Sequence, residues 1–153
     1  MSVAALIVWI VAAAGGFILL GTWIAKSGQK PGASRFPAGV IFGHFGLAAA
    51  GLILWIVYLI TDARALAWVA LVVVVVIALL GFTMFLRWIP TCRVKMGRAP
   101  TAPAATSADQ AGGAAAIPVT DLAESHFAVP VVVAHGLFAV GTLVLVLLTA
   151  LAL

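Results

Sequence analysis

Charged residues are scarce in this chain: Asp, Glu, Lys and Arg make up only 8% of its 153 residues. A soluble domain normally carries about 25% charged residues. Apolar residues account for 65% of the chain, and the mean hydropathy is +1.29. The composition therefore excludes an ordinary soluble domain and predicts an integral membrane protein, for which the lipid bilayer is the first partner.

Cysteine and acidic residues are also rare, with one cysteine, Cys92, and four Asp or Glu. A single cysteine forms no internal disulfide, and the sequence has no Cys/His cluster typical of a zinc site. The net charge of +4 does not indicate nucleic-acid binding, because the basic residues lie at the ends of apolar segments. No nucleophile–His–acid set, phosphate loop or intramembrane carboxylate pair is present, so catalytic activity of the chain alone is not expected.

Four apolar segments are long enough to cross a bilayer as helices, which takes about 20 residues each. The expected spans are about residues 3–25, 37–60, 66–86 and 127–153. They predict an all-α fold, a single membrane domain built as a four-helix bundle with up-down topology. The stretch at about 100–116 is rich in Ala, Pro, Gly, Ser and Thr, and it predicts a disordered linker.

Basic residues are distributed unequally among the connections between these spans. Seven of the eight Lys and Arg residues lie in the first and third connections. With four spans, these two connections share one side of the membrane, and the positive-inside rule places that side in the cytoplasm. The chain is therefore expected to be a multi-pass protein of the cell membrane with both termini outside.

The segment before the last span, TDLAESHFAVP, predicts a short interfacial helix. Thr120 or Asp121 would cap it, with Glu124 completing a capping box. Leu122 and Phe127 are expected to face the membrane. Pro130 would either kink the junction or mark the start of the span.

Two histidines lie inside predicted spans, where a polar side chain is a functional-site hypothesis by default. His44 lies seven residues after Pro37, and His135 lies eight residues after Phe127. At 1.5 Å per residue, both are roughly 10–12 Å beyond the start of their spans. The two spans run in the same direction, so the histidines are expected at similar depth in the cytoplasmic half.

Two imidazoles at one depth indicate a haem b site, since haem iron takes one axial nitrogen ligand on each face. His44 and His135 would be the iron ligands. Small residues beside them would leave room for the macrocycle, and two arginines at the cytoplasmic boundary would bind the haem propionates. These predicted cofactor-binding residues are Gly43, Gly46, Ala48, Gly51, Gly136, Ala139, Arg35 and Arg87, with Gly15 and Gly16 thinning the first span. Phe42, Phe45 and Phe138 are expected to pack on the ring edge.

With His44, His135 and their neighbouring glycines, the arrangement resembles b-type membrane cytochromes, including the ascorbate-reducible kind. The resemblance covers the helical core and implies haem held between histidines of parallel helices in a four-helix core. Those cytochromes commonly bind two haems through four histidines, whereas this chain has three histidines. The resemblance therefore implies one haem and an electron-transfer subunit of a larger membrane complex.

A second interpretation needs no cofactor. His44 and His135 would then hydrogen-bond each other or nearby carbonyls, and the chain would be an accessory subunit packed against a larger membrane partner or forming a homo-oligomer. A proton relay is a third use for the pair. His126, beside Glu124 near the interface, is either a solvated side chain or a contact for a quinone, a metal ion or a haem propionate. The five tryptophans lie mostly toward span ends, as in an aromatic belt.

Overall fold

The computed structural model describes residues 1–97 and 121–152. Within these residues the chain is entirely helical, which confirms the predicted all-α class. Four long helices are present: α1, Ser2–Ala25; α2, Ala38–Thr61; α3, Arg64–Lys95; and α4, Val129–Leu151. A short 3-10 helix, η2, Ala123–His126, precedes α4. The predicted linker at 100–116 lies outside the described residues.

Each of the four long helices is long and apolar enough to cross a membrane. Many of their large apolar side chains point outward, such as Ile7, Val72 and Phe82, each more than half exposed. Exposed apolar surface of this extent is costly in water and suits a lipid environment. The fold is therefore that of a four-helix bundle compatible with a multi-pass membrane protein.

The helix boundaries follow from local backbone chemistry. Pro37 precedes α2 with extended backbone, where its missing N–H costs nothing. Asp62 ends α2 in the left-handed conformation, with φ of 53°. Pro130 lies in the first turn of α4, so it marks the start of the helix rather than a kink.

Helix α3 extends nine residues beyond the predicted end of its span at residue 86. It continues through Pro90 because residues on both sides of the proline still bury their side chains, including Trp88, Thr91 and Cys92. Arg93 and Lys95 lie in the last turn, where positive charge opposes the negative end of the helix dipole. The sequence pattern located the apolar part of this helix and not its polar extension.

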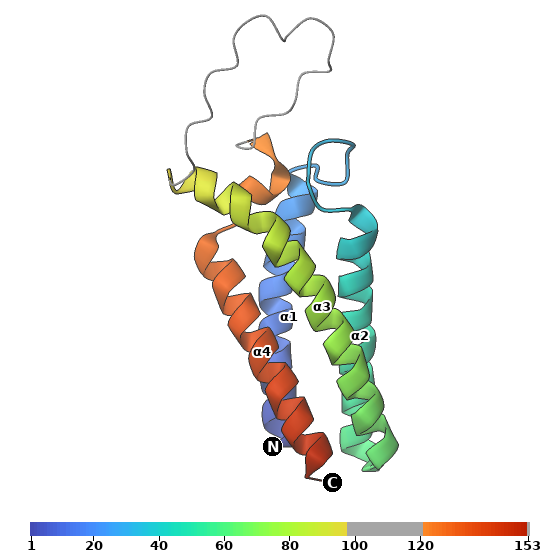
Figure 1. The fold of residues 1–153 in the computed structure, drawn as a ribbon. Coiled ribbons are helices and arrows are strands. Elements are labelled where there is room, and N and C mark those ends of the chain that lie inside the picture. The colour runs from blue at the N-terminus through green and yellow to red at the C-terminus, as the bar shows by residue number, and fades with distance from the viewer. Residues whose placement is uncertain (98–120, 153) are drawn as a thin grey trace, which may run out of the picture.

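Figure 1 shows both chain ends at one end of the bundle, with η2 and the connection between α1 and α2 at the other. Helix α1 packs mainly against α4, and α2 packs mainly against α3. These two pairs come together through contacts of α3 with α4 and of α1 with α2. Helices α2 and α4 therefore lie diagonally across the bundle.

The buried side chains form two clusters, one toward each end of the bundle. The cluster near the chain ends includes Trp9, Trp55 and Tyr58. The cluster near η2 includes Trp23 and Trp88. Only Trp68 among the five tryptophans is exposed, so the predicted aromatic belt is wrong for the other four. A position near a span end does not reveal which face of the helix a side chain occupies, and here the large rings fill the core.

Candidate functional site

His44 and His135 occupy equivalent positions on the two diagonal helices. Each is six residues after the first residue of its helix, Ala38 for α2 and Val129 for α4. The structure brings the two imidazoles together, with ring centroids 6.3 Å apart and planes inclined at 67°. The pair forms a layer between the two apolar clusters and belongs to neither.

Each imidazole is held by a backbone carbonyl of a neighbouring helix. Nδ1 of His44 lies 3.0 Å from the carbonyl oxygen of Ile77 on α3. Nδ1 of His135 lies 2.8 Å from the carbonyl oxygen of Ala12 on α1. A carbonyl only accepts, so Nδ1 must be the donor in both bonds, and the lone pair of each neutral ring is then on Nε2. The structure thus favours carbonyl bonding over a direct bond between the two histidines.

Three glycines allow the two rings to occupy this layer. A Cβ at Gly15 would lie 3.3 Å from Cβ of His135, and one at Gly16 would lie 3.2 Å from its Cε1. A Cβ at Gly81 would lie 3.1 Å from Cε1 of His44. These distances are shorter than ordinary van der Waals contact, so side chains at all three positions would push on the imidazoles. Sequence reasoning named Gly15 and Gly16 but missed Gly81, because the sequence does not show that this position of α3 faces His44.

Most of the glycines predicted to line the site lie elsewhere. A Cβ at Gly43, Gly46 or Gly136 would meet nothing within 4 Å, so these three face open space. Gly51 instead lets the ring of Trp9 approach α2. The physical reason is the helical period, since residues one or two positions from a histidine point to other sides of the helix.

The two predicted alanines are better placed. Ala48 and Ala139 each follow a histidine by four residues, which puts them on the same helix face one turn further along. Both are partly buried. Small side chains one turn from the histidines therefore come from α2 and α4, in addition to the glycines of α1 and α3 that contact the rings.

The predicted aromatic contacts also differ from those observed. Phe42 packs edge-on against Trp23, with ring centroids 6.0 Å apart. Phe45 packs edge-on against Phe17, with centroids 5.1 Å apart. These two phenylalanines therefore fill the contact between α1 and α2.

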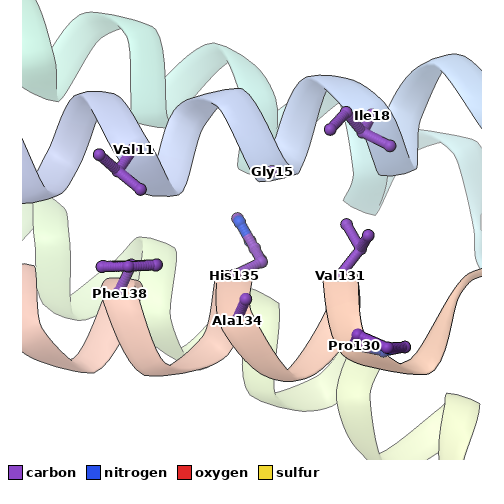
Figure 2. A pocket seen from close by; sticks show the side chains of 8 residues that line it. All are labelled: Val11, Gly15, Ile18, Pro130, Val131, Ala134, His135 and Phe138. Carbon is purple, nitrogen blue, oxygen red and sulfur yellow. The ribbon is translucent and has the colours of Figure 1, made fainter.

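An apolar groove of about 260 Å³ lies between α1 and α4, and His135 supplies its ionisable side chain. Figure 2 shows the side chains that line it. Its walls are Val11, Gly15, Ile18, Pro130, Val131, Ala134, His135 and Phe138. Val11, Ile18 and Phe138 are all at least 40% exposed, so the groove opens to the outside of the bundle. One edge of the histidine layer is therefore accessible from the surroundings of the helices.

The predicted propionate-binding arginines lie together at the end of the bundle that carries η2. Nη1 of Arg87 donates a hydrogen bond of 2.9 Å to the backbone oxygen of Arg35. The backbone N–H of Arg35 donates to Oε1 of Glu124, also at 2.9 Å. Glu124 is completely buried, and its Oε2 has no partner among the described residues.

Helix η2 differs from the predicted interfacial helix in two respects. Glu124 does not form a capping box, since it binds the first connection and η2 has no side-chain cap. Leu122 and Phe127 are buried in the protein rather than facing the membrane. Lys95 holds the segment from α3, because its Nζ donates to the backbone oxygens of Ser125 and Phe127 at 3.2 and 3.3 Å.

His126 is exposed, and its Nδ1 lies 3.3 Å from both the carbonyl oxygen of Leu122 and Oγ of Ser125. It does not join the central histidine layer. Cys92 is a free, buried cysteine in the cluster near η2. Among residues 1–97 and 121–152, no group of three or more His, Cys, Asp or Glu side chains is arranged to hold a metal ion.

The separation of the central pair is that of two imidazoles bound to one metal. In such a site the metal lies about 2 Å from each ligating nitrogen, and that nitrogen lies about 1 Å from the centre of its ring. Each ring centroid is then about 3 Å from the metal, so the two centroids are about 6 Å apart. The observed separation of 6.3 Å meets this requirement. Ligating histidines usually donate their other N–H to a carbonyl or carboxylate, as both of these rings do. Haem iron needs only two protein ligands, because the porphyrin supplies the others.

Comparison with known proteins adds no relative: no protein-family model matches the chain, and no curated protein or solved structure matches it.

Proposed function

We propose that this chain is a multi-pass membrane protein that holds one haem b between His44 and His135 and transfers electrons as a subunit of a larger membrane complex. The observation that supports the proposal is the imidazole pair. The two rings have the separation that a shared iron needs, and each directs its proton to a carbonyl. A haem bound there would supply one-electron oxidation and reduction at its iron.

The surrounding residues have defined tasks in this proposal. The carbonyls of Ala12 and Ile77 would keep each Nε2 unprotonated and fix the ring orientation. The two apolar clusters above and below the layer would exclude water from it. Arg35 and Arg87, at the η2 end, would provide positive charge for the haem propionates.

The orientation in the membrane is part of the proposal. The end of the bundle with η2 and the first connection also carries Arg35, Arg87, Arg93 and Lys95. The positive-inside rule assigns this end to the cytoplasm. In the cell membrane, the histidine layer would then lie in the cytoplasmic half, and both chain ends would lie outside.

A cofactor-free accessory subunit is the second candidate, and one observation favours it. The imidazoles already hydrogen-bond to neighbouring helices, and Gly15, Gly16 and Gly81 fit closely around them. In that function the histidines would stabilise the bundle, and such interhelical bonds contribute about 0.6 kcal/mol on average.

An absorption spectrum of the purified full-length protein, expressed with haem supplied, distinguishes the two candidates. The haem proposal predicts a Soret band and the reduced-minus-oxidised bands of a six-coordinate b-type haem. His126→Ala should keep these bands, because His126 is exposed on η2 and remote from the central layer. A colourless protein would refute the haem proposal in favour of the accessory subunit. In that case, His44→Ala and His135→Ala would each cost about 1 kcal/mol of bundle stability.

A further inference from the structure

Positive charge gathers at the end of the bundle that carries η2. Six cationic side chains, all exposed, form this basic end of the bundle: Lys26, Lys30, Arg35, Arg87, Arg93 and Lys95. Among the described residues, the same segments carry two carboxylates, Asp121 and Glu124. At the opposite end of the bundle, the connection between α2 and α3 carries Asp62 and Arg64, whose charges cancel. The excess of positive charge is therefore confined to one end.

Hydrogen bonds join the segments of the basic end to one another. Nη1 of Arg87 on α3 donates to the backbone oxygen of Arg35 in the first connection, at 2.9 Å. The backbone N–H of Arg35 in turn donates to Glu124 of η2. Nζ of Lys95, near the end of α3, donates to the backbone oxygens of Ser125 and Phe127. The cationic groups are therefore held close together on a connected structure.

The nearby buried carboxylate does not neutralise these cations by direct contact. Oε1 of Glu124 accepts a backbone N–H, and its Oε2 has no hydrogen-bond partner among the described residues. Arg87 and Lys95 donate to backbone oxygens, which carry no net charge. Like charges held close together repel one another, and anions from the surroundings relieve this repulsion. The basic end is therefore suited to an anionic ligand.

Exposed apolar side chains beside the cations indicate which kind of anion fits. Leu86 directly precedes Arg87, and Val94 lies between Arg93 and Lys95; both apolar side chains are exposed. A soluble anion would pair with the cations but leave these apolar side chains in water, which is costly. A phospholipid supplies both complements, because its phosphate faces the cations and its acyl chains cover the apolar surface.

We propose that the basic end binds the headgroups of anionic phospholipids in preference to zwitterionic ones. Lys26, Lys30 and Arg93 have no part in the proposed haem site, so these three side chains are the expected lipid contacts. The inference goes beyond the proposed function and requires no cofactor, since it depends only on the charge and the apolar surface at one end of the bundle.

Electron paramagnetic resonance of spin-labelled lipids tests this preference. The full-length protein is reconstituted in phosphatidylcholine bilayers that contain a trace of spin-labelled phosphatidylglycerol or spin-labelled phosphatidylcholine. The fraction of label immobilised at the protein gives the relative association constant of the two lipids. The wild type should favour phosphatidylglycerol by at least about fivefold, the factor that corresponds to one cation at a membrane surface.

A charge-neutralised variant and a matched control locate the preference on the protein. Combining Lys26→Gln, Lys30→Gln and Arg93→Gln should remove most of the preference for phosphatidylglycerol. Arg64→Gln removes one cation from the opposite end of the bundle and should keep it. In the wild type, added sodium chloride should also reduce the preference, because salt screens exposed charges.

Equal association of the two lipids with the wild type would overturn the inference. So would a preference that survives the triple substitution, or one that Arg64→Gln abolishes. Displacement of spin-labelled phosphatidylglycerol by inorganic phosphate, but not by chloride of equal ionic strength, would identify a site for a soluble anion instead. None of these measurements needs haem, so a colourless protein would refute the haem proposal without deciding this one.

Discussion

The glycines that pack against the imidazoles of His44 and His135 allow a direct test of the observed packing, because a larger residue at these positions would collide with the rings. Gly81→Ala and Gly16→Ala would place a methyl group 3.1 and 3.2 Å from the Cε1 atoms of His44 and His135. Each added methyl would force the imidazole or its helix to move by a few tenths of an ångström. Overpacking of this kind costs about 1–3 kcal/mol. We therefore expect both variants to lower stability and to change the absorption of a bound haem.

Matched controls come from two glycines that sequence reasoning had placed beside the histidines. In Gly43→Ala and Gly136→Ala the new methyl would meet nothing within 4 Å. Alanine is favoured over glycine in a helix by about 1 kcal/mol. These variants should therefore be neutral or slightly stabilised, so the two groups should differ by about 2 kcal/mol in unfolding free energy.

The assay is reversible unfolding of the purified protein in mixed micelles, followed by helical circular dichroism, with the visible spectrum recorded in parallel. Gly43→Ala and Gly136→Ala should not destabilise the protein as much as Gly16→Ala and Gly81→Ala do. Equal effects would mean that the faces of α2 and α4 assigned to the bundle interior are incorrect.

Two further predictions concern orientation and the basic end of the bundle. A periplasm-active reporter fused after Leu153 should be active and one inserted at Ala105 inactive; the reverse pattern would put the histidine layer in the opposite half of the membrane. Glu124→Ala should lower the unfolding free energy by about 1–3 kcal/mol, because it removes the acceptor of the Arg35 N–H and leaves that donor unsatisfied. Glu124→Gln keeps an acceptor and should lose less; equal losses would show that the hydrogen bond contributes little.

The four helices could be predicted because each is a long apolar run with a clear end. The end of α3 was not predictable in this way, since hydropathy detects contact with lipid and not burial of Trp88 or Cys92 inside the bundle. The four buried tryptophans show the same limit, because position along a span does not specify which face of a helix points inward.

The candidate site was partly accessible to sequence reasoning. Similar offsets from the two expected span starts, seven and eight residues, indicated that His44 and His135 share a depth, and the structure places their ring centroids 6.3 Å apart. The residues that support them were harder to identify. Ala12, Ile77 and Gly81 belong to other helices and carry no polar side chain, so only the three-dimensional arrangement identifies their contribution.

Glu124 shows why long-range pairing escapes a local analysis. Its position suggested a capping box within its own segment. In the structure its partner is the backbone of Arg35, 89 residues earlier in the chain. Nothing in the local pattern distinguishes these two uses of a glutamate.

The most direct test of the central claim is the electron paramagnetic resonance spectrum of the oxidised, haem-loaded protein. Two imidazole ligands should give a low-spin ferric signal in the wild type. His44→Gly and His135→Gly should each convert it to a high-spin signal or lose the haem, and added imidazole should restore the low-spin signal where haem remains. A protein without haem, or two variants that retain the native low-spin signal, would contradict the account.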